Sequence, residues 1–152
     1  MQRLDDLYCF RLGALIRRIS RYYNNRLSKL GITLGQSFVL LYLLDEDGSS
    51  VKDIAAAVQL DSPAVTGLVD RLIKQELVLR QEDSQDRRIT QIFLTAEGRK
   101  IAEEATTISL EFNPYLKRHL AEGAMVGLEQ TMTDLEKKLR DQETENDALS
   151  NN

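Results

Sequence analysis

The fold is decided by residues 50–94, which read SVKDIAAAVQLDSPAVTGLVDRLIKQELVLRQEDSQDRRITQIFL. Two places in this stretch are typical of helix starts: Ser50, and the cluster Asp61-Ser62-Pro63 with Pro in the first turn. Ser and Asp oxygens can accept a hydrogen bond from the first turn of a helix. The sequence therefore predicts a short helix over 51–58 and a second helix from this cluster to about 75. Two short helices joined by so few residues indicate a helix-turn-helix.

The remainder of this stretch reads as two short strands, in which successive side chains fall alternately on two faces. Residues 77–81 and 89–94 both alternate, and the segment between them, 82–88, is polar and charged. This pattern predicts a two-stranded hairpin with a charged tip. A helix-turn-helix followed by such a hairpin is typical of the winged helix-turn-helix arrangement.

Two helices are predicted before this segment. Apolar residues recur at steps of three and four over residues 4–30, which predicts one long amphipathic helix that ends at Gly31. Thr33 and Gln36 then form a capping box, in which each side chain satisfies a free backbone donor of the other residue. The apolar run 38–44 continues this second helix, which we expect to be buried.

The helices after the hairpin carry an interruption and an apolar seam. Thr95 is expected to cap a helix that Pro114 should interrupt, because proline lacks the backbone donor and clashes with the preceding turn. Beyond Gly123, apolar residues step by three and four as in a short coiled coil. The members of this C-terminal seam are Met125, Leu128, Met132, Leu135 and Leu139.

These elements predict a mainly α fold with a two-stranded β-wing. We expect a helical dimerisation region over 1–32 and 98–140, because the apolar stripes of its helices need a partner chain to cover them. The winged helix-turn-helix lobe is expected to occupy 33–97. The polar, acidic residues 141–152 are expected to form a flexible tail.

Composition narrows the classes of function. The chain has 152 residues and a formal net charge of −4, so a nucleic-acid partner would need local positive charge. One Cys and one His cannot form an internal disulfide or a His/Cys metal cage, and we expect no metal and no cofactor. The longest apolar run has seven residues, far short of the roughly 20 that span a bilayer. We therefore expect a cytoplasmic protein without a membrane partner. The absence of phosphate-binding and nucleophile motifs argues against an enzyme.

The outer face of the second short helix is a candidate surface for duplex DNA. Its N-terminus is small and carries hydroxyl groups, so it can enter a major groove and offer backbone N–H groups to a phosphate. Arg71 and Lys74 lie further along and could reach the DNA backbone. The candidate residues on this helix are Ser62, Pro63, Ala64, Thr66, Arg71 and Lys74.

The hairpin tip is the second candidate DNA contact. Asp86, Arg87 and Arg88 place two arginines beside a carboxylate. A carboxylate can orient an arginine fork, which then enters a narrow minor groove where the negative potential is concentrated.

Four segments resemble the MarR (multiple antibiotic resistance regulator) family. They are residues 61–72, Glu76-Leu77-Val78, Asp83-x-x-Asp86-Arg87-Arg88 and Leu94-Thr95-Ala96-Glu97-Gly98. The resemblance implies a homodimer with intertwined N- and C-terminal helices that binds a pseudo-palindromic operator, often as a repressor released by aromatic or phenolic ligands or by oxidation. By position, it implies that Arg88 is the minor-groove arginine and that Asp86 orients it. Gln85 departs from the family, where many members have a basic residue or Asn.

Two regulatory alternatives and one non-DNA function stay open. An aromatic effector could bind a pocket formed by Arg17, Arg18, Tyr22, Tyr23, Phe38 and Tyr42. Alternatively, Cys9 could sense peroxide, since Tyr8-Cys9-Phe10 resembles the site of the organic hydroperoxide resistance branch of the family. In that branch tyrosines activate the cysteine through hydrogen bonds, and this chain has Tyr23 at one of their positions but Gly13 and Leu34 at the other two. The carboxylates of Asp5 and Asp6 near Cys9 also disfavour a thiolate, so we expect Cys9 to be buried and inert. The winged lobe could also serve as a protein-interaction module that does not bind DNA.

Overall fold

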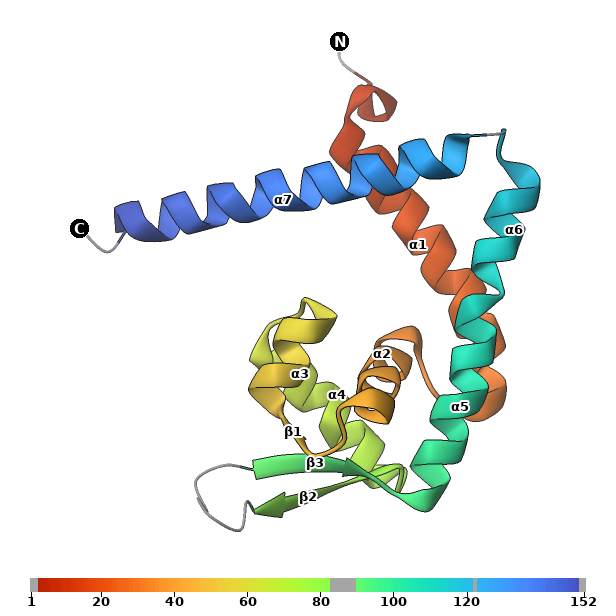
Figure 1. The fold of residues 1–152 in the computed structure, drawn as a ribbon, viewed down its shortest axis with the longest axis vertical. Helices are drawn as coiled ribbons and strands as arrows, with labels where there is room; N and C mark the ends of the chain where they lie inside the picture. Colours follow the sequence, from red (N-terminus) through yellow and green to blue (C-terminus); the bar gives the residue numbers. More distant parts are fainter. Residues whose placement is uncertain (1–2, 83–89, 122, 151–152) are drawn as a thin grey trace. The chain divides into compact units, whose positions relative to one another are not determined.

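The computed structural model describes residues 3–82, 90–121 and 123–150, with side chains described for all of these except 5 and 143–150. The chain forms two compact units, residues 1–110 and 111–152 (Figure 1). The first unit contains α1 (Tyr8–Leu27), α2 (Leu34–Asp45), α3 (Val51–Val58), α4 (Ser62–Lys74) and α5 (Ala96–Leu110), together with a small sheet. The second unit contains α6 (Phe112–His119) and α7 (Ala124–Ser150).

The sheet is antiparallel, and its strand order is β1 (Ser49–Ser50), β3 (Thr90–Leu94), β2 (Val78–Glu82). Strands β2 and β3 confirm the predicted hairpin. Strand β1 was not predicted, because two residues are too short to show an alternating pattern. The fold class is confirmed as mainly helical with a β-wing, and the wing has a short third strand.

The start of the chain differs from the single helix predicted over residues 4–30. Leu4–Asp6 forms a separate 3₁₀ turn, and Leu7 is extended, with φ −89° and ψ 114°. The Asp6 carboxylate accepts a hydrogen bond from the Arg3 N–H at 3.1 Å, which closes this turn on itself. At the other end, Gly31 has φ 70°, the left-handed conformation that ends a helix, as predicted.

The predicted helix starts of α2, α3 and α4 are confirmed. Thr33 and Gln36 form the reciprocal capping box of α2. Ser50 accepts a hydrogen bond from Asp53 N–H at the start of α3, and Asp61 caps α4. The tight break between α3 and α4 is made by Gln59, which adopts the left-handed conformation with φ 55°.

The core of the first unit lies between α2, the helix-turn-helix and α5. Apolar residues of α3 and α4 are buried there, and so are residues of α2, β3 and α5. The buried apolar residues of these elements include Val39, Leu40, Leu43, Ile54, Val65, Val69, Leu72, Ile92, Ala102 and Ala105. Phe38 is an exception to the prediction of a buried run over 38–44, because it is 44% exposed.

The C-terminal helices follow the predicted interruption. Helix α5 ends at Leu110 and α6 begins at Phe112, so Pro114 lies in the first turn of a new helix. Its ring therefore avoids a clash with the carbonyl of Leu110 inside a continuous helix. Helix α7 continues to Ser150, so the backbone of residues 141–150 is helical where the sequence predicted a flexible tail. Its Glu, Gln and Ala residues favour helix, and no Gly or Pro stops it there.

Within the described ranges, no single helix has the length and apolar character needed to cross a membrane. The segments Tyr8–Leu30 and Leu34–Asp45 meet that test only as a pair, bent by 69°.

Candidate nucleic-acid interface

The N-terminus of α4 is capped by the chain itself. The Asp61 carboxylate accepts the Ala64 N–H at 2.7 Å, and the Asp61 carbonyl accepts the Val65 N–H at 3.1 Å. Pro63 has no N–H to offer. The prediction that the backbone donors at this end bind a phosphate is therefore wrong for Ala64 and Val65. Contact with a ligand at this end has to come mainly from side chains.

The side chains predicted to contact DNA lie along the outer face of α4. Its opposite face is buried in the core through Val65, Val69 and Leu72. On the outer face, Thr66 is partly exposed and its hydroxyl donates to the Ser62 carbonyl at 2.8 Å. The exposed residues among the candidates are Ser62, Pro63, Ala64, Arg71 and Lys74.

An ion pair joins α4 to the wing. Arg80 on β2 contacts the Asp70 carboxylate at 2.9 Å, and the two side chains are 39% and 49% exposed. A pair this exposed contributes little to folding stability. Its consequence is electrostatic, because Arg80 neutralises an acidic side chain on the face that carries Arg71 and Lys74. Sequence patterns did not indicate this pair, since its members lie on different elements.

The other end of α4 is held by a polar bridge that runs from a buried glutamine to an exposed one. Gln36, which is 3% exposed, donates to the Gln75 side-chain oxygen at 2.6 Å, and Gln75 donates to the Gly31 carbonyl at 2.7 Å. These bonds tie the end of α4 to the start of α2 and to the turn after α1. The sequence indicated the capping role of Gln36 and missed its second partner.

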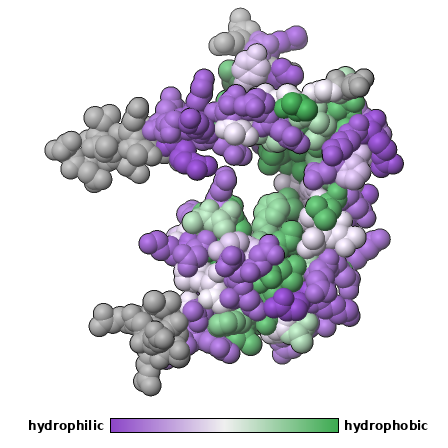
Figure 2. Space-filling model, in the orientation of Figure 1, coloured by the Kyte–Doolittle hydropathy of each residue, from purple (hydrophilic) through white to green (hydrophobic). Residues whose placement is uncertain are grey.

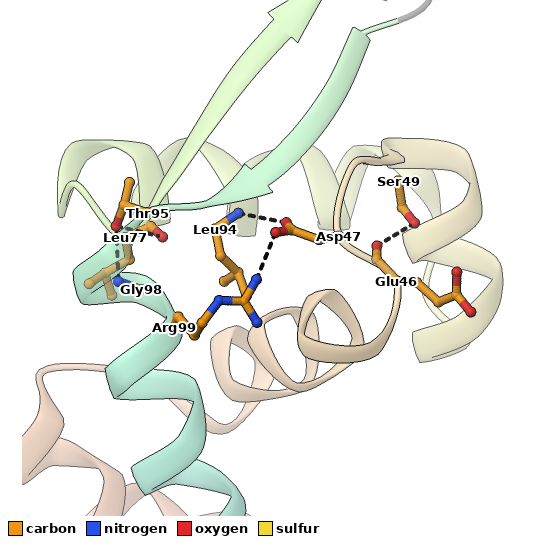
Figure 3. A network of polar contacts seen from close by, with 8 residues as sticks. All are labelled: Glu46, Asp47, Ser49, Leu77, Leu94, Thr95, Gly98 and Arg99. Carbon is orange, nitrogen blue, oxygen red and sulfur yellow. Dashed lines mark hydrogen bonds and ion pairs between the residues drawn. The ribbon is translucent and has the colours of Figure 1, made fainter.

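The base of the wing meets α5 at a close-packed corner (Figure 3). The Thr95 hydroxyl donates to the Glu76 carbonyl at 2.8 Å and accepts the Gly98 N–H at 2.9 Å, which confirms Thr95 as a helix cap. A side chain at Gly98 would overlap the Leu77 carbonyl. The turn after α4, the end of β3 and the start of α5 are therefore one tightly connected unit.

The predicted contacts at the wing tip, Asp86, Arg87 and Arg88, lie outside the described residues. Strand β2 ends at Glu82 and β3 begins at Thr90. Both strands thus extend toward the segment that contains these three residues.

The six candidate effector residues do not form one cluster in the structure. Phe38 and Tyr42 line an open pocket of about 330 Å³, and the other residues of its lining are Leu41, Ala57, Val58 and Gln59. Tyr22 and Tyr23 instead form an edge-to-face pair with ring centroids 5.5 Å apart.

The other four effector candidates, Arg17, Arg18, Tyr22 and Tyr23, lie on α1. The Arg26 guanidinium lies 4.0 Å from the centre of the Tyr22 ring, and the Tyr23 hydroxyl donates to the Ser109 carbonyl at 3.1 Å. Arg17 and Arg18 are exposed. The lining of the pocket with Phe38 and Tyr42 thus includes none of the other four candidates.

The buried position of Tyr23 gives the folding equilibrium an alkaline dependence. Burial, with a smaller contribution from Tyr22, raises the pKa of Tyr23 above its ordinary 10.0. Above pH 10 an unfolded Tyr23 loses its proton while the folded one retains it. Folding stability should therefore fall as the pH rises through this range.

We expect Tyr23→Phe to lower stability near neutral pH by about 0.5–1.5 kcal/mol, because the hydrogen bond to Ser109 is lost. Its stability should also fall less steeply than that of wild type above pH 10. Urea unfolding at pH 8 and pH 10.5 measures both effects. If the stability of both proteins fell by the same amount between pH 8 and pH 10.5, the raised pKa of Tyr23 would be contradicted.

Cys9 is exposed in the described chain, so the prediction of a buried thiol is wrong for a single protomer. It lies in the first turn of α1, next to the exposed Tyr8. The described residues contain no group of three or more His, Cys, Asp or Glu side chains placed to hold a metal ion.

Comparisons with known proteins agree with this geometry. A family model described as the MarR family matches residues 32–90. The HTH-type transcriptional regulator TtmR of Methylorubrum extorquens (strain PA1) is 40% identical over 98 residues, which are 64% of this chain and 50% of that protein. The organic hydroperoxide resistance transcriptional regulator of Bacillus subtilis (strain 168) is 33% identical over 106 residues, 70% of this chain and 72% of that protein.

Among solved structures, the S. aureus MepR–DNA complex is similar, with a TM-score of 0.82 and 29% identity. The match covers 88% of this chain and 98% of that one. These three relatives are regulators and not enzymes. The chain belongs to the MarR family and has its DNA-binding transcriptional regulator fold, a winged helix-turn-helix.

Proposed function

We propose that this protein is a sequence-specific transcriptional repressor that binds a pseudo-palindromic operator as a homodimer and is released by a small aromatic or phenolic effector. The observation that carries the proposal is the outer face of α4. It presents small and hydroxyl-bearing residues at one end and exposed Arg71 and Lys74 at the other, beside the wing. We expect the protein to act in the cytoplasm, where its DNA lies.

The charge of this face supports DNA as the ligand, although the chain as a whole has a net charge of −4. Because Arg80 pairs with Asp70, the acidic side chain does not oppose a phosphate near Arg71. The similar MepR structure was solved in complex with DNA. In this account Ser62, Pro63, Ala64 and Thr66 meet the major groove.

Exposed apolar side chains support a homodimer. On the N-terminal segment they are Leu4, Leu7, Tyr8, Leu12, Leu15 and Ile16, and on α7 they are Val126, Leu128, Met132, Leu135 and Leu139. Figure 2 shows some of the hydrophobic side chains at the surface. Stripes of this length on a folded chain indicate a protein interface. A second copy of the same chain would cover them and would place two copies of α4, the proposed recognition helix, on one duplex.

A two-fold dimer fixes the form of the operator. Two recognition helices reach successive major grooves when they lie about one helical turn, roughly 34 Å, apart. We therefore expect an inverted repeat of about 16 to 20 base pairs.

We expect Arg88→Ala to weaken binding to most sequences by about 1–3 kcal/mol, because the wing arginine contacts a minor groove. Substitutions of Ser62 or Thr66 should instead change which bases are preferred, since they lie on the major-groove helix. Titrations of an operator duplex selected from genomic fragments, and of the same duplex with single base changes, separate the two effects. If a folded Arg88→Ala protein bound as tightly as wild type, the wing assignment would be wrong.

Release by an effector is supported by the pocket that Phe38 and Tyr42 line between α2 and α3. A ligand there can change DNA affinity only if it binds unequally to two arrangements of the dimer, one with its α4 helices spaced to engage the duplex together and one without that spacing. Titration of salicylate into a preformed DNA complex tests this step. Release should be lost in a Tyr42→Ala variant, and release that persists there would exclude the pocket.

Oxidation at Cys9 is the second candidate for release. Its support is the exposure of Cys9 and the similarity to a relative named for organic hydroperoxide resistance. Against it, the Tyr23 hydroxyl already donates to Ser109 within its own chain. Cumene hydroperoxide should abolish DNA binding in wild type and not in Cys9→Ser if this route operates. Equal binding in both proteins would exclude it.

A further inference from the structure

We propose that Asp47 is a positioning residue for the wing. Its carboxylate connects the turn after α2 to the end of β3 and to the start of α5 (Figure 3). The proposal rests on the proposed function, because its effect is read through contact of the wing with DNA.

One carboxylate oxygen of Asp47 continues the β1–β3 ladder. Strand β1 pairs with β3 over two residues, and the Gly48 N–H adds a bond to the Ile92 carbonyl at 2.9 Å. Two residues further along β3, the Leu94 N–H points to the same edge. The backbone has by then turned toward α2, and Asp47 Oδ1 accepts this N–H at 2.8 Å. The side chain thus replaces a missing backbone acceptor.

The other oxygen reaches α5. Asp47 Oδ2 lies 2.9 Å from Nη2 of Arg99, the fourth residue of that helix. The Arg99 and Asp47 side chains are 46% and 32% exposed, so the ion pair itself adds little to folding stability. Its effect is geometric, because one carboxylate holds a strand and a helix in fixed relation.

The opposite side of the same corner is already fixed by Thr95, Gly98 and the turn after α4. Asp47 adds side-chain contacts from the α2 side to this corner, which α4 shares. Together these contacts set the direction in which β3 leaves the corner.

A small tilt at the corner has a large effect further along the wing. A five-residue strand is about 17 Å long, so a tilt of about 10° at its base moves its far end by about 3 Å. Hydrogen bonds tolerate donor–acceptor distances of only about 2.7 to 3.2 Å. Loss of Asp47 should therefore weaken contacts at the wing tip while the fold remains.

Charge and position make opposite predictions for this residue. Removal of a carboxylate from a DNA-binding protein raises DNA affinity if charge alone matters. The positioning role predicts a loss. Glu46 provides the matched control, because it lies in the same turn and contributes its backbone carbonyl, which accepts the Ser49 hydroxyl at 2.7 Å. Glu46→Gln removes the same charge and leaves the Asp47 contacts in place.

The test uses the full chain and an operator duplex selected from genomic fragments. We expect Asp47→Ala to bind about fivefold to tenfold more weakly than Glu46→Gln, with a shallower salt dependence because wing contacts to phosphate are lost. Asp47→Asn keeps an oxygen for the Leu94 N–H but turns its amide N–H toward Arg99, so its affinity should lie between those of Asp47→Ala and Glu46→Gln. Thermal unfolding checks that each variant is folded. If Asp47→Ala does not fold, Asp47→Asn takes its place and should still bind more weakly than Glu46→Gln, which removes the same charge.

A double variant shows whether the effect passes through the wing. In an Arg88→Ala background, Asp47→Ala should cause little further loss, because the contact it positions is already absent. Equal affinities of Asp47→Ala and Glu46→Gln, or a full additional loss in the Arg88→Ala background, would overturn the proposal. If wild type binds no selected duplex, the proposed function itself fails, which is a different result from either of these.

Discussion

Replacement of Gly98 by alanine is expected to destabilise the first unit by about 3 kcal/mol or more. An added Cβ would overlap the Leu77 carbonyl oxygen and lie 2.8 Å from its carbon. That backbone cannot easily retreat, because the Leu77 carbonyl also accepts the Thr95 N–H at 3.1 Å. The corner between the wing and α5 would have to open.

Gly67→Ala is the matched control for this substitution. Gly67 lies inside α4, and nothing stands within 4 Å of an added Cβ. Alanine there should raise stability by about 0.5–1 kcal/mol, because glycine is a poor helix former. Urea unfolding of both variants measures the difference. A Gly98→Ala protein as stable as wild type would show that the corner is looser than described.

Leu135→Asp should reduce operator affinity by about 10² or more, because it separates the dimer and leaves each lobe to bind half a site alone. Leu135 is 46% exposed on α7 and lies between Met132 and Leu139 in the apolar seam. A charge in the centre of a covered interface would have to be desolvated without a partner.

Thr133→Asp introduces the same charge two residues earlier, on the opposite side of α7. It should leave both the dimer and its operator affinity close to wild type. Sedimentation and operator titration of the two variants give the comparison. Leu135→Asp that stays dimeric would show that another surface holds the protomers together.

Local features of the fold could be predicted from the sequence because they depend on neighbouring residues. Ser50, Asp61 and the Thr33–Gln36 pair cap helices through bonds between residues three apart in the sequence, and the structure contains all of them. The hairpin followed from the period of its side chains. The resemblance to the MarR family followed from short motifs within residues 61–98.

Long-range polar contacts could not be predicted in this way. Asp47 and Arg99 lie 52 residues apart, and Gln36 and Gln75 lie 39 apart. No periodic pattern connects such pairs, and each became visible only once the helices and strands had been placed. Strand β1 was missed for a related reason, since its two residues are defined by their partners on β3.

The candidate sites differ in the same way, because one depends on local periodicity and the other on long-range contacts. The outer face of α4 could be predicted, because helical periodicity fixes which residues lie opposite the core. The effector cluster could not, because an aromatic residue carries no signal of which neighbour it will contact. Tyr23 thus turned out to bond Ser109 on α5, while Phe38 and Tyr42 line a pocket elsewhere.

The central claim is that two copies of this chain bind one duplex through their α4 helices and wings. Its most direct test is a titration of the purified chain into the selected operator at several salt concentrations, with the mass of the complex measured at saturation. We predict two chains per inverted repeat and an affinity that falls steeply as salt rises, because neutralised phosphates release counterions. Failure to select any duplex, or saturation by a single chain without salt dependence, would contradict the claim and favour a protein-interaction module.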